Sequence, residues 1–189
     1  MKTIKITLAI LLISSASMAQ NSNSLTYVSS ADASIYQGDN VRNYGTELKL
    51  SVKNKKGSTV SRRSLLQFDL SGQETKTFTK AVLKFYVNNL EAAEGSSANS
   101  LIIDISSIEN NWKESEVNWK IAPKPVLKIA SIQVENEKTW YEVDLTDYIK
   151  GLISNEKVFS LILTNSEGNG TLAELSSKEG KNKPSLILQ

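Results

Sequence analysis

The stretch RRSLLQFDLSG (residues 62–72) decides the fold class of this chain of 189 residues. It is a short apolar run between two arginines and a Ser-Gly turn signal, a pattern typical of a strand. Three later stretches also combine apolar segments with turn residues: NWKESEVNWKIAP (111–123), WYEVDLTDYIK (140–150) and ELSSKEGKNKPSLIL (174–188). Many short strands, with a turn signal about every 8–12 residues, predict an all-β fold, a jelly-roll β-sandwich.

The apolar residues of most segments recur with a period of two, which is the spacing of strands. Leu48, Leu50 and Val52 are expected on one face of such a strand. Lys49 and Lys53 alternate with them and are expected on the other face. The strands predicted in this way cover residues 25–28, 48–53, 60–70, 81–87, 101–108, 126–134, 158–163, 172–176 and 186–188.

One short helix is predicted near residues 145–153, where Asp144 or Thr146 can cap the first turn. No internal repeat or low-complexity linker divides the chain. Residues 20–189 have the size of one domain, and we expect them to form a single β-sandwich domain. The apolar face of the predicted helix is formed by Tyr148, Ile149 and Leu152.

The first 19 residues have the three parts of a secretory signal peptide. Lys2 and Lys5 supply the positive start, and residues 6–13 form an apolar stretch too short to span a bilayer. Ser17-Met18-Ala19 offers the small residues of a cleavage site. We therefore expect a mature protein without a membrane span, secreted to the periplasm or to the outside of a bacterial cell. The alternative is an apolar N-terminal strand that stays in the domain.

The chain contains no histidine and no cysteine. This excludes Ser-His and Cys-His nucleophile pairs, and zinc or copper sites built from these residues. A glycosidase-type pair of carboxylates would have to come from Glu114, Glu116, Asp144 and Glu179. We expect these residues in turns, at a helix cap and on the surface. The prediction is that the chain is not an enzyme, and no catalytic residue is assigned.

Charge is balanced overall but not along the chain. Without Lys2 and Lys5, 20 basic residues remain against 20 acidic residues, which argues against nucleic acid as a partner. The segment from Leu48 to Phe68 nevertheless holds no acidic residue. Its six basic residues are Lys49, Lys53, Lys55, Lys56, Arg62 and Arg63.

Strand alternation places Lys49 and Lys53 on one face, and it places Arg62 and Arg63 on opposite faces. We expect at most one of these arginines to join the two lysines at the surface, and the other to be buried or at an interface with a carboxylate partner. Such a basic ridge suits an acidic polymer, because an arginine grips a carboxylate through two hydrogen bonds.

The aromatic residues divide into two groups. Trp112 and Trp119 bracket a short polar turn and Trp140 leads an alternating strand, so we expect all three to pack against the core. Tyr36 and Tyr44 lie in predicted loops and are better candidates for stacking against a sugar. The complete set of predicted ligand-binding residues is Tyr36, Arg42, Tyr44, Lys49, Lys53 and Arg62.

Asp32, Asp39 and Asn40 could supply oxygen ligands for a structural calcium ion. Their spacing matches no defined calcium loop, and turn formation by Asp and Asn explains the same residues. No other cofactor is predicted.

Several short motifs occur in order along the chain. They are Ala31-Asp32-Ala33 with Asn43-Tyr44-Gly45, Arg63 to Ser71, Trp112 with Glu114, Val117, Trp119 and Pro123, Trp140 with Asp144, Leu145 and Thr146, and Ser177 with Glu179, Pro184 and Leu186. Together they resemble the DNRLRE-domain group, also classed as carbohydrate-binding module family 96, over essentially the whole mature chain.

The resemblance implies a jelly-roll β-sandwich of a kind found beside polysaccharide lyases and other carbohydrate-active enzymes. It also implies basic residues that contact uronate polymers in some members. This sequence departs from the pattern in its lysine-rich turn at residues 53–58. Loops of this kind are where the choice of ligand would lie, so the resemblance supports the fold more strongly than the ligand.

Three functions stay open at this point. The favoured one is a secreted, non-catalytic carbohydrate-binding module for an acidic extracellular polysaccharide such as alginate. The second is a structural or surface-assembly protein that binds another protein, because no catalytic domain accompanies the module. The third, least favoured, is a small polysaccharide lyase or hydrolase that uses Tyr, Arg or carboxylates.

Overall fold

The computed structural model describes residues 24–71, 78–96, 99–153 and 156–189. The predicted signal peptide lies outside these ranges. Within them the elements in chain order are β1 (Leu25–Val28), β2 (Ala31–Tyr36), β3 (Lys49–Lys55), β4 (Arg62–Asp69), β5 (Ala81–Glu91), β6 (Leu101–Ile108), β7 (Leu127–Val134), β8 (Thr139–Asp144), α1 (Thr146–Ile153), β9 (Val158–Asn165), β10 (Asn169–Ser176) and β11 (Ser185–Leu188).

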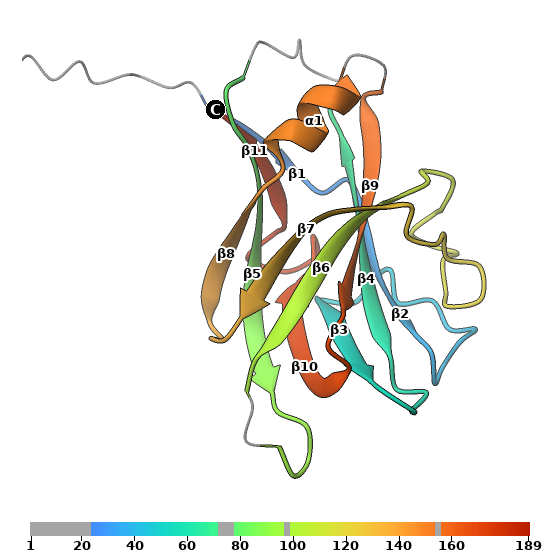
Figure 1. Cartoon of the computed structure of the whole chain (residues 1–189). Helices are drawn as coiled ribbons and strands as arrows, with labels where there is room; N and C mark the ends of the chain where they lie inside the picture. Colours follow the sequence, from blue (N-terminus) through green and yellow to red (C-terminus); the bar gives the residue numbers. More distant parts are fainter. Residues whose placement is uncertain (1–23, 72–77, 97–98, 154–155) are drawn as a thin grey trace, which may run out of the picture.

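The strands form one curled antiparallel sheet in the order β1-β11-β5-β10-β3-β4-β9-β6-β7, and β8 pairs with β5 while β2 pairs with β4. In Figure 1, β8 and β5 lie on the left, β4 and β2 lie on the right, and α1 lies at the top. Because the sheet curls, its halves face each other across a shared core. The prediction of an all-β jelly-roll sandwich is confirmed.

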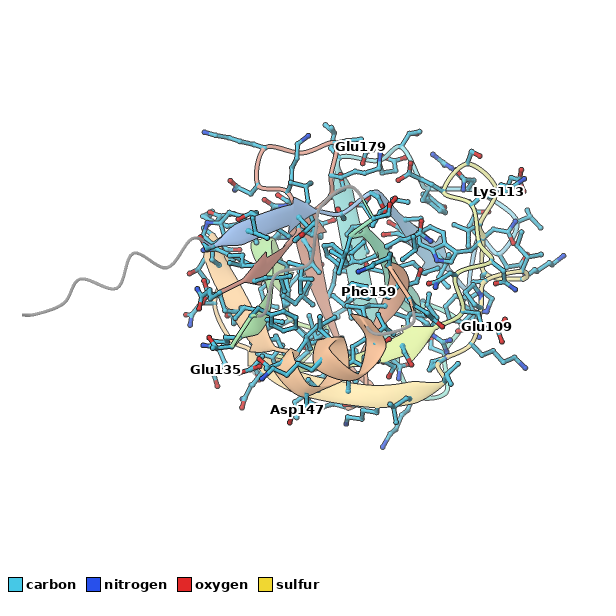
Figure 2. All side chains as sticks on the ribbon, turned by 90° about the horizontal axis from the view of Figure 1, so that it is seen from above. Glu109, Lys113, Glu135, Asp147, Phe159 and Glu179 are labelled. Atoms are coloured by element: carbon cyan, nitrogen blue, oxygen red, sulfur yellow. The ribbon has the colours of Figure 1, made fainter. Side chains whose placement is uncertain are left out.

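Period-two alternation builds this core. Phe68 of β4, Phe85 of β5 and Phe159 of β9 are among the largest fully buried side chains. The rings of Phe68 and Phe159 stack with their centres 5.4 Å apart. Seen from above, Phe159 lies well inside the molecule, and the labelled charged residues lie toward its periphery (Figure 2). Burying a phenylalanine contributes about 1.5–3 kcal/mol to the free energy of folding.

Strand β4 is buried on both faces, unlike a strand of a two-layer sandwich that has one wet face. Leu66 belongs to the main core, and its neighbour Leu65 belongs to a second cluster on the opposite face. The connection from β6 to β7 folds over this second cluster and places Trp112 on it, where the indole N–H donates to Ser160 Oγ at 3.0 Å. The second cluster consists of Ala33, Ile35, Leu65, Ile108, Trp112, Val117 and Ile162.

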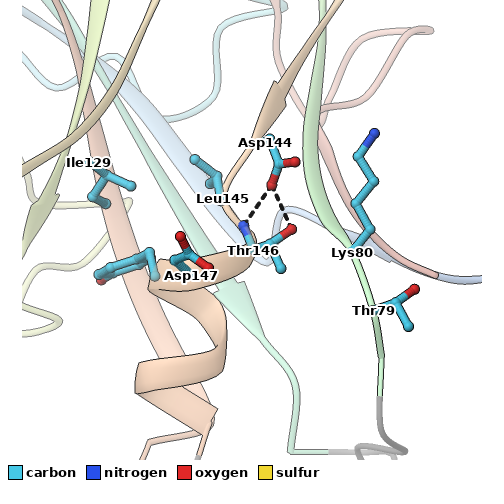
Figure 3. A pocket seen from close by; sticks show the side chains of 8 residues that line it. Thr79, Lys80, Ile129, Asp144, Leu145, Thr146 and Asp147 are labelled. Carbon is cyan, nitrogen blue, oxygen red and sulfur yellow. Dashed lines mark hydrogen bonds between the residues drawn. The ribbon is translucent and has the colours of Figure 1, made fainter.

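The short helix is confirmed, with its first residue at Thr146. Asp144 Oδ1 accepts hydrogen bonds from the Thr146 N–H at 2.9 Å and from the Thr146 hydroxyl (Figure 3). These bonds stabilise the carboxylate and hold the pKa of Asp144 below its ordinary value. Thr146 Oγ1 accepts from the Ala81 N–H at 2.9 Å, which fixes α1 to β5. Of the residues described, no helix has the length and apolar character needed to cross a membrane.

Three local expectations were wrong. Leu48 precedes β3 and is 68% exposed, so it is not part of the core. Trp140 is 39% exposed, because β8 turns Tyr141 and Val143 inward and alternation then turns Trp140 outward. Residues 31–36 form a strand that the sequence did not predict. Two of the residues that this strand packs against the second cluster are alanines, Ala31 and Ala33, which give only a weak apolar signal in the sequence.

The core analysis makes a stability prediction. Phe159→Ala should lower the free energy of unfolding by about 3–5 kcal/mol, because the removed ring leaves a cavity in the apolar core. Leu127→Ala, which removes a 57% exposed side chain, should stay within about 0.5 kcal/mol of the wild type. Urea denaturation of both variants checks this, and an equal loss in the two would contradict the assigned core.

Candidate functional site

Four side chains that are distant in sequence stack on one another at one edge of the sheet. The ring centres of Tyr36 and Tyr44 are 4.0 Å apart. The Arg62 guanidinium lies 4.5 Å from the centre of the Tyr36 ring, and the Arg42 guanidinium lies 4.8 Å from that of Tyr44. We call Arg42, Tyr44, Tyr36 and Arg62 the Arg-Tyr stack. It brings together four of the six side chains that the sequence suggested as ligand-binding residues.

Strand pairing explains how these residues meet. Tyr36 closes β2 and stands directly opposite Arg62, the first residue of β4. An isolated antiparallel β-bridge between Ser34 and Tyr44 brings the loop that follows β2 back beside this strand. The Tyr44 hydroxyl donates to Asp39 Oδ2 at 2.8 Å and completes the loop. The stack is therefore held by backbone pairing as well as by its ring contacts.

A guanidinium over the face of an aromatic ring is attracted to the ring, and such a contact contributes about 0.5–1 kcal/mol at an exposed site. Arg42 has a side chain that is 60% exposed and forms a long ion pair of 3.5 Å with Glu47. Such an exposed pair is weak and can be exchanged for a ligand.

Lys53 lies directly across from Arg62 in the pairing of β3 with β4. Both residues border a hollow of about 210 Å³, which Arg63 also lines. Arg62 and Arg63 point to opposite faces, but they occupy the first two positions of β4, where side chains from both faces reach the open end of the strand. The hollow thus has three basic side chains on its lining.

Arg63 does not have the predicted carboxylate partner. Its guanidinium lies 4.5 Å from the centre of the Trp119 ring, and burial lowers its pKa. In the part of the chain that the structure describes, no acidic side chain lies within ion-pair distance of Arg63. Sequence reasoning therefore missed both Arg63 and Trp119 as parts of this surface. The one feature of the sequence that could have pointed to Arg63 was its position directly after Arg62 in the stretch 62–72.

Lys49 lies apart from the Arg-Tyr stack. Its ammonium pairs with Glu174 Oε1 at 2.5 Å, on the neighbouring strand β10. Between Lys49 and Lys53, Ser51 is fully buried and its hydroxyl is 3.2 Å from the Tyr36 hydroxyl. The two lysines do share a face, as alternation predicts, but Tyr36 interrupts the ridge between them.

The loop that carries Arg42 and Tyr44 is fastened to the β6–β7 connection. The Asn43 amide donates to the backbone carbonyl oxygens of Glu114 at 2.6 Å and Val117 at 2.8 Å. Gly45 packs so closely here that a Cβ atom would lie 2.2 Å from the Glu114 carbonyl oxygen. The position of the Arg-Tyr stack depends on this contact, because any larger residue would push the loop away.

A group of charged residues lies beneath this contact, and we call Asp32, Glu114, Lys178 and Glu179 the polar junction. Asp32 Oδ2 accepts from the Lys178 N–H at 2.7 Å, and Glu114 Oε1 accepts from the Asp32 N–H at 2.7 Å. The Lys178 ammonium pairs with Glu114 at 3.1 Å and with Glu179 at 2.5 Å. Burial raises the pKa of Asp32 to about 7, and the negative charges of Glu179 and Glu114 act in the same direction.

The four carboxylates considered for glycosidase chemistry have other contacts. Glu114 and Glu179 do come together, but they surround Lys178 and their contacts hold the fold. Glu116 pairs with Lys113, and Asp144 caps α1.

The residues considered for calcium also have protein partners. Asp32 is 1% exposed and accepts from the Lys178 N–H, and Asp39 accepts from Tyr44. Within the described ranges no group of three or more His, Cys, Asp or Glu side chains is arranged to hold a metal ion. Asp39 lies in a turn, as expected, but Asp32 lies in β2, so the turn-forming role expected for Asp32 was wrong.

Comparison with known protein families identifies the fold. Residues 23–189 match the family described as carbohydrate-binding module family 96. The chain belongs to this family. A comparison with curated proteins found no match. The resemblance to carbohydrate-binding module family 96 seen in the sequence is thus confirmed, and carbohydrate binding is the activity that the name of family 96 describes.

The sequence motifs that carry the resemblance to family 96 now have a structural meaning. Asp32, Gly45, Glu114 and Glu179 come from three of these five motifs and meet at or beside the polar junction. The basic side chains of the Arg-Tyr stack lie next to the junction and not within it.

The raised pKa of Asp32 predicts a pH dependence of stability. The folded chain holds this proton more tightly than the unfolded chain, so the free energy of unfolding should fall as the pH rises from about 4 to about 7 and then level off. Each unit of pKa difference corresponds to about 1.4 kcal/mol. Asp32→Asn removes the titrating group and should flatten this fall. Denaturation curves from pH 4 to pH 8 measure it, and equal slopes in the two proteins would refute the assignment.

The close approach at Gly45 makes a second prediction. Gly45→Ala should lower the free energy of unfolding by about 1–3 kcal/mol, because the Glu114 backbone cannot move without disturbing the junction. Gly151→Ala is the matched control, since nothing lies within 4 Å of its added Cβ. It should instead stabilise the helix by up to about 1 kcal/mol. Thermal unfolding of the two variants distinguishes these opposite signs.

Proposed function

We propose that this chain is a non-catalytic module that binds an acidic extracellular polysaccharide, with alginate as the first polymer to test. The observation that carries the proposal is the Arg-Tyr stack, next to a hollow lined by Lys53 and Arg63. Membership of carbohydrate-binding module family 96 supports a carbohydrate as the ligand. The clustered positive charge supports an acidic one.

The geometry suits a uronate carboxylate. Arg42 and Arg62 lie at the two ends of the stack, each with a planar guanidinium resting on a tyrosine ring. A planar guanidinium can donate two parallel N–H bonds to a carboxylate, and such charge-assisted bonds are roughly twice as strong as neutral ones. Because the rings already order the guanidinium groups, less conformational entropy is lost when the ligand binds.

A binding role also agrees with the chemistry of the surface. The chain has no histidine or cysteine, and arginines stacked on tyrosines are well suited to holding charge. The four candidate carboxylates are engaged elsewhere, at the polar junction, with Lys113 and at the helix cap. In this proposal secretion, through the predicted signal peptide, delivers the module to the polymer.

The proposal predicts that Arg42→Ala combined with Arg62→Ala weakens binding to alginate by about tenfold or more, because two charge-assisted contacts are lost. Replacing both residues with lysine should restore part of the affinity, since the charge returns without the planar fork. Binding of the wild type should also weaken as salt rises. Isothermal titration and affinity gel electrophoresis measure these effects.

The matched control is Lys80→Ala combined with Lys150→Ala, which removes the same charge from two exposed residues beside and within α1. This control should bind as the wild type does. No binding of the wild type to any acidic or neutral glycan, together with a stable oligomer or a co-purified partner protein, would favour the surface-assembly function instead. Release of unsaturated or reducing sugar products would reveal an enzyme.

A further inference from the structure

An aromatic pair, the half-buried Tyr86 and the exposed Trp140, lies on the outer face of β5 and β8, away from the Arg-Tyr stack. Tyr86 and Trp140 stand opposite each other in the pairing of these strands. Their ring centres are 5.3 Å apart and their planes meet at 72°. The Lys84 ammonium lies 5.0 Å from the centre of the Trp140 ring and also pairs with Glu142 at 3.0 Å. These contacts hold the Trp140 ring in place although it is 39% exposed.

A hollow of about 510 Å³ opens beside this pair. Tyr86 and Asn88 of β5 and Ser176 of β10 contribute to it from the strands, and Ser176 Oγ donates to Asn88 Oδ1 at 3.1 Å. The chain between β10 and β11 forms one wall, which includes Asn182. Lys138 lines it as well. The lining therefore offers amide, hydroxyl and ammonium groups, and the carboxylate of Glu179 at the polar junction, next to an aromatic surface.

This face continues toward the proposed polysaccharide site. Ser176 lines the hollow and is paired with Lys49 across β10 and β3. Further along β3, Lys53 pairs with Arg62 of the Arg-Tyr stack. Three strand spacings, about 14 Å, separate β8 from β3, and Lys49 and Lys53 stand about 14 Å apart along β3. A chain of several sugar rings can cover this span.

The chemistry of the surface selects the occupant. A sugar ring presents C–H groups on its face and hydroxyl groups at its edge, which matches one fixed aromatic ring bordered by polar groups. A protein partner would need a broader apolar centre than one tryptophan with a polar surround. A nucleic acid would also stack on Trp140, but the balanced charge of the mature chain argues against it.

We infer that Trp140, with Tyr86 and the adjoining hollow, forms a second subsite that takes a sugar ring of the same polysaccharide chain. The inference rests on the proposed function for the identity of that chain. The two subsites differ in their physics. The Arg-Tyr stack binds through charge and is sensitive to salt, and the Trp140 subsite binds mainly through ring contact and is nearly insensitive to it. A long polymer occupies both, which raises its affinity above that of a short oligomer.

Alginate oligomers of increasing length, and the polymer itself, test the inference against wild type, Trp140→Ala and Trp140→Phe. Trp140→Ala should weaken binding of the long chains about 5- to 20-fold at both low and high salt, in the range found for stacking contacts. The same substitution should leave unchanged the affinity for the shortest oligomers that bind the Arg-Tyr stack. Trp140→Phe should recover most of the loss, because an aromatic face is restored.

Leu127→Ala, which removes another exposed apolar side chain from β7, is the matched control and should bind like the wild type. Equal unfolding temperatures of the variants would show that Trp140→Ala is folded. If the arginine variant loses affinity while Trp140→Ala equals the wild type at every length, this inference is overturned and the proposed function stands. If the wild type binds neither alginate of any length nor any other acidic polysaccharide, the proposed function fails and this inference fails with it.

Discussion

The arrangement of the candidate binding surface depends on one constraint, the need to satisfy a carboxylate that is buried away from water. Asp32 is 1% exposed, and an unpaired charge in such a place would cost several kcal/mol. The backbone N–H of Lys178 donates a hydrogen bond to this carboxylate and offsets part of the cost. The backbone N–H of Asp32 in turn donates to Glu114. Three separate segments are thereby joined at one point, around residues 32, 114 and 178.

The segments joined in this way carry or border the candidate binding residues. The loop after β2 brings Arg42 and Tyr44, the β6–β7 connection brings Trp119, and the chain after β10 forms a wall of the second hollow. A change at the polar junction would therefore move several of the candidate binding residues together.

The sequence predicted the fold well because alternation is a local signal. The strands at 25–28 and 101–108 occur where they were expected, and the helix begins within a residue of its predicted start. The failures are also physical. Leu48 and Trp140 are apolar but stand where the sheet ends or turns outward, and Ala31 and Ala33 are too small to mark a strand. Apolar character alone does not show which side of a strand another segment will cover.

The candidate site was predictable only in part. Residue type drew attention to Tyr36, Tyr44 and the basic segment, but the contacts that unite them depend on pairings between distant strands. Alternation could not show that Trp119 would replace a carboxylate as the partner of Arg63, because the β6–β7 connection reaches β4 through tertiary packing.

The stacking of Arg42 and Arg62 on a shared pair of tyrosine rings has a consequence for selectivity. Flexible lysines on a surface adapt to almost any arrangement of negative charge, but these two guanidinium groups are held at a set separation by the thickness of the rings between them. A polymer would be selected by the repeat distance between its acidic groups and by its helical pitch. Two polymers of equal charge density but different backbone linkage would then be told apart.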